Sequence, residues 1–88
     1  MDKQSFQELG LYLREKRVKK NITQVEVADK LGYRSQFIAN WERGASSPPV
    51  PALRKLVAIY GISQKEVLDF LGDLQQDFWK RKLFSKKR

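Results

Sequence analysis

Residues 23–44, with the sequence TQVEVADKLGYRSQFIANWERG, predict two short helices joined by a tight turn. Thr23 and Glu26 stand at the spacing of a capping box, in which each side chain bonds the backbone N–H of the other residue. Apolar residues then recur at helical spacing until Gly32, a residue type that often ends helices in the left-handed conformation. The first helix of the pair is therefore expected over residues 24–31.

The second helix of the pair is expected over residues 35–43, and Gly44 ends it. Ile38 and Trp41 recur at helical spacing and form its apolar face. Ala28 lies in the first helix, where its small side chain lets the two helices cross at close quarters. A bulkier residue at this position would hold the helices apart.

This pair of helices resembles the helix-turn-helix of the phage-repressor family, of the Cro and XRE type. The resemblance rests on Thr23, Gln24, Ala28, Gly32, Ile38 and the Trp41-Glu42-Arg43-Gly44 ending. It extends over most of residues 6–71. It implies an all-α fold, a compact lambda-repressor-like domain of five helices over residues 1–72. Beyond the resemblance, the residues themselves predict a short C-terminal helix or basic arm over residues 73–88.

The other helices have start signals of their own. Capping-box patterns at Ser5 and Ser63 predict the starts of the first and fifth helices. Pro51 suits the first turn of the fourth helix, and Gly61 ends that helix. Asp73 is placed to cap a sixth helix.

The first helix places Arg17 on the same face as the apolar residues Leu9 and Leu13. The resemblance implies that this arginine pairs with Glu42, which would fix the angle between the first and third helices. The alternative is that both side chains are solvated. Gly10 lies among the apolar residues and allows close approach of a neighbouring helix.

A recognition helix presents its N-terminal residues to base edges in the major groove. We therefore expect base contacts from Ser35, Gln36, Phe37 and Asn40. Gln36 and Asn40 can each donate to and accept from adenine, and Phe37 can press on a thymine methyl. The alternatives are that Gln36 and Asn40 are ordinary surface residues and that Phe37 belongs to the core. Arg34 stands where the family often has Ser or Thr, so the helix could instead start one residue later.

Phosphate contacts are expected around this helix. The resemblance implies one from Gln24, at a helix N-terminus whose free N–H groups and dipole favour an anion. Arg34 and Arg43 are the expected cationic contacts, and Arg34 could instead take a guanine edge. The backbone N–H groups of Ser46 and Ser47 are weaker candidates, in a loop that carries no cation although this loop is often basic in the family.

Composition limits the other classes of function. The 88 residues have room for one domain and contain neither Cys nor His, so disulfides, thiolate metal sites and the commonest general base are excluded. Four acids are spaced like a solvated helix face: Glu66, Asp69, Asp73 and Asp77. We expect no enzyme activity, cofactor or metal. Without a long apolar run or a secretory signal, a cytoplasmic protein of bacterial or phage type is expected.

The net charge of +8 comes mainly from the end of the chain. Residues 78–88 hold six of the eighteen Lys and Arg residues and no acid. The candidate contact residues there are Trp79, Lys80, Arg81, Lys82, Lys86, Lys87 and Arg88. This tail could form a helix packed on the domain or on a partner, or an arm along DNA phosphates. Contact with an anionic membrane surface is the least favoured of the three interpretations.

The expected function is sequence-specific binding of duplex DNA to regulate transcription. One recognition helix reads only a few base pairs, so a repressor-type homodimer on a pseudo-palindromic operator is the natural arrangement. The fifth helix and residues 74–84 are the candidate dimer surface. Two alternatives remain: an antitoxin or accessory protein whose main partner is another protein, and an interaction module that has lost DNA binding.

Overall fold

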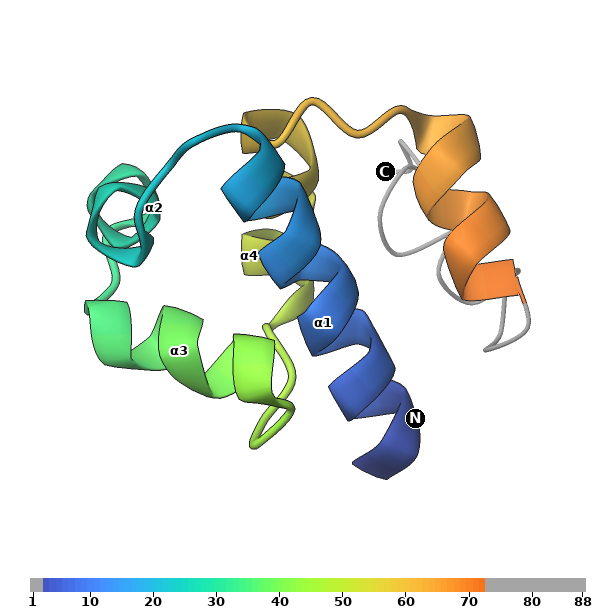
Figure 1. Cartoon of the computed structure of the whole chain (residues 1–88), viewed down its shortest axis with the longest axis horizontal. Coiled ribbons are helices and arrows are strands. Elements are labelled where there is room, and N and C mark those ends of the chain that lie inside the picture. Colours follow the sequence, from blue (N-terminus) through green and yellow to red (C-terminus); the bar gives the residue numbers. More distant parts are fainter. Residues whose placement is uncertain (1–2, 73–88) are drawn as a thin grey trace. The chain divides into compact units, whose positions relative to one another are not determined.

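The computed structural model describes residues 3–72, and the side chains of residues 6–72. Within these residues the secondary structure is helical, without a strand. The helices are α1 (Lys3–Lys19), α2 (Gln24–Leu31), α3 (Ser35–Arg43), α4 (Val50–Ile59) and a fifth helix that includes residues 64–72 (Figure 1). The all-α, five-helix fold expected from the sequence is confirmed. The sixth helix expected from Asp73 lies outside the described residues.

The chain divides into two compact units, and the boundary along the sequence falls between Pro48 and Pro49. The first unit contains α1, α2 and α3, and the second contains α4 and the fifth helix. No helix among the described residues combines the length and the apolar character needed to cross a membrane.

The capping box at the start of α2 is complete. The Thr23 hydroxyl accepts from the Glu26 N–H at 3.1 Å, and the Glu26 carboxylate accepts from the Thr23 N–H at 2.8 Å. Hydrogen bonding of the Glu26 carboxylate to the Thr23 backbone N–H, and to a smaller extent to the Thr23 hydroxyl, lowers the pKa of Glu26 below its usual 4.5. Gly32 ends the helix with a φ of 76°. The predicted bounds of α2 are therefore confirmed, and its apolar residues Val27, Ala28 and Leu31 are buried.

Two glycines allow α1 and α3 to approach closely. A Cβ atom on Gly10 of α1 would lie 2.7 Å from the carbonyl oxygen of Glu42, which is closer than real Cβ contacts. Gly44, at the end of α3, has a φ of 77°, and a Cβ there would lie 2.6 Å from the Cα atom of Gln7. The crossing of these helices therefore brings backbone against backbone, and a side chain at either position would force the neighbouring helix to shift.

The start of α1 differs from the sequence prediction. The helix begins at Lys3, and Ser5 lies inside it instead of capping it. The helix is thus extended by Lys3, Gln4 and Ser5, and because Lys3 and Gln4 are both good helix formers this extension costs little. After the end of the helix, Asn21 takes the left-handed conformation with a φ of 63°, which asparagine adopts more readily than most residues.

The second unit follows the predicted start signals. Pro51 lies in the first turn of α4, and Gly61 follows the helix with a φ of 67°. The Ser63 hydroxyl accepts from the Glu66 N–H at 3.0 Å and caps the fifth helix. The buried residues of this unit are Ala52, Leu53, Leu56, Val57, Tyr60, Ile62, Val67, Leu68 and Leu71.

Candidate nucleic-acid interface

The turn between α2 and α3 leaves Arg34 available to a ligand. This residue occupies the N-cap position of α3 in an extended conformation, and its side chain makes no capping hydrogen bond. Its side chain is exposed. Ser35 is the first residue of the helix and is half-buried. The predicted bounds of α3 therefore match the structure.

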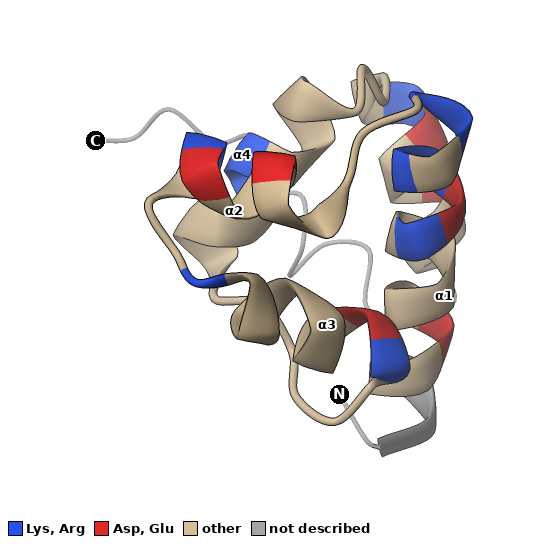
Figure 2. Ribbon diagram, turned by 60° about the vertical axis from the view of Figure 1, so that its left-hand side comes forward, with Lys and Arg blue, Asp and Glu red and all other residues tan. Residues whose placement is uncertain are grey.

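The helix α3 has one buried face and one polar face. Ile38, Trp41 and Glu42 are buried. Gln36 and Arg43 are exposed, and Asn40 is half-buried. Figure 2 shows that α3 is uncharged over most of its length and carries charge only at its C-terminal end. The polar face is therefore formed mainly by amide side chains.

These polar side chains are joined by hydrogen bonds. The Gln36 amide nitrogen donates to the Asn40 side-chain oxygen at 3.1 Å, and the Arg43 guanidinium donates to the same oxygen at 2.5 Å. Arginine can only donate, so the Asn40 amide must turn its oxygen toward Arg43. Gln36 must then present its nitrogen to that oxygen. The cation thus determines the orientation of both amides.

An aromatic cluster lies beside this polar face. Phe37 is 47% exposed, and its ring packs edge to face against Tyr33, with ring centroids 5.4 Å apart. Tyr33 also meets the buried Trp41 edge to face at 5.2 Å. Phe37 is therefore supported on one side and exposed on the other. Tyr33 was not predicted as part of the site, although the spacing of Phe37 and Trp41 four residues apart could have indicated the cluster.

An ion pair connects α1 with α3. The Arg17 guanidinium donates to the two carboxylate oxygens of Glu42 at 2.6 and 3.1 Å, and it also donates to the Ile22 carbonyl at 2.8 Å. The Arg17 and Glu42 side chains are only 12% and 3% exposed. A two-point pair with this burial is the pairing that the sequence analysis expected, and solvation of both side chains is not observed.

Gln24 joins the same network. Its amide nitrogen donates to the Glu42 carboxylate at 3.0 Å, so Glu42 receives hydrogen bonds from both α1 and α2. The sequence prediction for Gln24 was a phosphate contact alone. Sequence reasoning missed the bond to Glu42, since these residues lie 18 positions apart.

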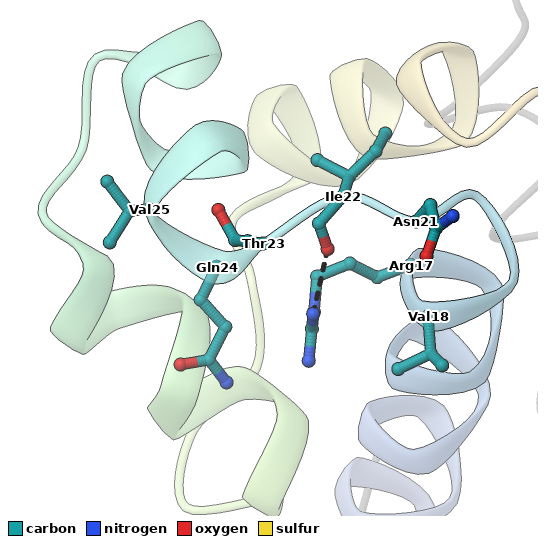
Figure 3. Close-up of a pocket in the computed structure, with 7 residues that line it drawn as sticks. All are labelled: Arg17, Val18, Asn21, Ile22, Thr23, Gln24 and Val25. Carbon is teal, nitrogen blue, oxygen red and sulfur yellow. Dashed lines mark hydrogen bonds between the residues drawn. The ribbon is translucent and has the colours of Figure 1, made fainter.

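An open hollow of about 530 Å³ lies where α1 ends and α2 begins. Figure 3 shows Arg17 and Gln24 directed into the space between these helices, below the Ile22 carbonyl. Val18 and Val25 also line the hollow, and both are exposed. Because Arg17 is already paired with Glu42, the other polar groups that line the hollow belong to Asn21, Gln24 and the first turn of α2.

The remaining predicted contact residues belong to the loop after α3 and to the tail of the chain. Ser46 is exposed and Ser47 half-buried, in the loop after α3. The tail residues Trp79, Lys80, Arg81, Lys82, Lys86, Lys87 and Arg88 lie outside the described residues. Within residues 6–72, no three His, Cys, Asp or Glu side chains gather in a way that could hold a metal ion.

The comparison with known proteins identifies the part of the chain that carries these features. A family model described as helix-turn-helix matches residues 13–67. The matched range contains α2, α3 and α4 entirely. No curated protein and no solved structure matches the chain.

Proposed function

The chain belongs to the XRE-type helix-turn-helix family of DNA-binding regulators, and we propose that it is a sequence-specific transcriptional repressor that binds duplex DNA as a homodimer. In this proposal α3 enters the major groove. Ser35, Gln36, Phe37 and Asn40 face the base edges, as the sequence analysis expected. The family is a regulatory one and not an enzyme class.

The observation that carries the proposal is the layout of α3. Its outer face offers amide groups, and its two ends carry Arg34 and Arg43. Nine residues at 1.5 Å per residue give a helix about 13 Å long, similar to a major groove about 12 Å wide. Neutral amides can then read bases while the two arginines reach phosphates on either side.

Gln24, Ser46 and Ser47 are proposed as further phosphate contacts. The Gln24 amide nitrogen has one N–H bonded to Glu42, which leaves its second N–H for a phosphate oxygen. The first turn of α2 supplies unpaired backbone N–H groups and the positive end of the helix dipole. Glu42 would then hold Gln24 in position while Gln24 holds the phosphate.

The homodimer is proposed because one recognition helix reads few base pairs, and two related by a twofold axis read an inverted repeat. The fifth helix and residues 74–84 remain the proposed dimer surface. A duplex DNA target is consistent with action in a bacterial cytoplasm.

The second candidate is an accessory protein or antitoxin of the same family, which binds another protein. Leu11 and Val18 of α1 favour this candidate, because they lie seven residues apart on one side of the helix and are 53% and 52% exposed. An apolar strip of this kind can bind a partner helix.

The test is selection of bound duplexes from a random DNA pool at roughly physiological salt. We expect an enriched motif of two inverted half-sites, about 34–36 Å apart from centre to centre. Enrichment of a single half-site would refute binding as a homodimer but would still support sequence-specific binding of DNA. Binding without enrichment, or no binding, would refute sequence-specific regulation and favour the accessory protein.

A further inference from the structure

We propose that Asn40 is a positioning residue that fixes Gln36 as the adenine-reading side chain of α3, and that Asn40 is not itself a second adenine reader. The inference rests on the proposed function, because it concerns how α3 distinguishes bases. It replaces the expectation from sequence that both amides contact adenine in the same way.

The side-chain oxygen of Asn40 is already used by two donors within α3. Bidentate reading of adenine requires an amide oxygen that accepts from the base N6 amino group and an amide nitrogen that donates to N7. An amide oxygen has two lone pairs. On Asn40 one is taken by Gln36 at 3.1 Å and the other by Arg43 at 2.5 Å. Asn40 would therefore have to give up a hydrogen bond before it could accept from adenine.

The bond from Arg43 is the harder of the two to give up. A hydrogen bond from a charged donor is roughly twice as strong as one between neutral groups. Loss of the bond from Gln36 would instead leave the Gln36 amide without the contact that holds its orientation. Either exchange weakens the network that α3 already has, so the groups left on Asn40 for DNA are its two N–H donors.

Gln36 is in the opposite position. Its amide nitrogen has two N–H groups, and only one is used for Asn40. The second N–H and the side-chain oxygen remain, and these are the two groups that bidentate contact with adenine needs. The bond to Asn40 also limits rotation of an otherwise flexible side chain, which reduces the entropy lost on binding. Gln36 is thus oriented before DNA arrives.

The test is a double-mutant cycle of Gln36→Ala and Asn40→Ala, in which the dissociation constant for DNA is measured. Gln36→Ala first identifies the base pair at which the wild-type preference is lost. All variants are then measured on four duplexes that differ only at this base pair. The duplexes are variants of the motif selected by the wild-type chain. We expect the wild type to prefer adenine there by about 5- to 150-fold, the discrimination of one bidentate contact. Asn40→Ala should reduce this preference at the same base pair, and the double variant should lose no more than Gln36→Ala alone.

A conservative variant separates the two roles of Asn40. Asn40→Asp keeps oxygens that accept from Gln36 and Arg43 but has no N–H donor. We expect weaker binding overall, because the new charge repels phosphates, with the adenine preference at the Gln36 position retained. As a control for affinity without base reading, Arg34→Ala should weaken binding to all four duplexes alike.

Three results would overturn the inference. Asn40→Ala could remove preference at a different base pair, with losses that add in the double variant. Asn40→Asp could convert an adenine preference at such a position to cytosine, as expected for a direct reader whose amide has become a carboxylate. Asn40→Ala could also leave every preference unchanged. All three results require that the wild-type chain first selects a motif from the random DNA pool. If the wild-type chain enriches no motif, the proposed function itself is refuted, and this outcome is distinguishable from the three above.

Discussion

Replacement of Glu42 by Gln is expected to destabilise the fold strongly, because it removes a charge without changing the shape of the side chain. The Glu42 carboxylate accepts two hydrogen bonds from Arg17 and one from Gln24. A glutamine has one oxygen, and its amide nitrogen would face the donors of Arg17. The guanidinium would keep its bond to the Ile22 carbonyl but would lose the buried carboxylate charge that now faces it.

The magnitude follows from the burial of the pair. Removal of one partner of a fully buried ion pair costs about 3–5 kcal/mol. The Arg17 side chain is 12% exposed, so some solvation remains, and we expect a loss of about 3 kcal/mol. A chain of this size has a free energy of unfolding of about 4–13 kcal/mol. At about 4–8 °C per kcal/mol, the melting temperature should fall by about 12–24 °C.

The assay is urea unfolding followed by circular dichroism at neutral pH. The matched control is Arg17→Met with Glu42→Leu, which removes both charges and leaves neither unpaired. A buried pair replaced by apolar residues of similar volume is often neutral or stabilising, so the double variant should recover most of the loss. A loss below about 1 kcal/mol for Glu42→Gln would place the pair in the range of exposed salt bridges and refute the reasoning.

Gly10→Ala should destabilise the fold by about 1–3 kcal/mol, because the new methyl group would overlap the carbonyl oxygen of Glu42. Gly72→Ala is the control, since a Cβ there meets no atom of residues 3–72 within 4 Å and alanine favours a helix. The lowered pKa of Glu26 means that its hydrogen bonds with Thr23 stabilise the fold above pH 4.5, and that this contribution is lost as the pH falls through the lowered pKa of the folded state. The difference in free energy of unfolding between the wild type and Glu26→Gln should therefore shrink in acid.

The predictions for Gly10→Ala and for Glu26→Gln each have a result that would contradict them. Equal melting temperatures for Gly10→Ala and Gly72→Ala would show that α1 and α3 do not approach as closely as described. A wild-type advantage over Glu26→Gln that stays constant from pH 7 to below pH 4 would show that the charged carboxylate does not contribute through the cap.

The bounds of α2 and α3 could be predicted from sequence because local signals determine them. The capping box at Thr23 and the left-handed glycines at positions 32 and 44 each act within a few residues. The start of α1 could not be predicted in the same way. A capping residue only favours a start, and the helix-forming residues before Ser5 extend the helix beyond it.

The side-chain network could be predicted only in part. Gln36, Asn40 and Arg43 lie four and three positions apart, so their contact on one helix face follows from helical spacing. The resemblance to phage repressors implied the pairing of Arg17 with Glu42. The bond from Gln24 to Glu42 depends on how α2 crosses α3, and no local pattern encodes that crossing. Likewise, only the packing against Tyr33 shows that Phe37 is both supported and exposed.

Substitution of single atoms in the operator tests most directly whether α3 reads bases in the major groove, as proposed. On the selected duplex, 7-deazaadenine at the position read by Gln36 removes an acceptor from the major groove, whereas 3-deazaadenine removes one from the minor groove. We predict that the first weakens binding by about fivefold or more and that the second leaves the dissociation constant unchanged. Weaker binding with 3-deazaadenine alone, or no effect of either base, would contradict the account.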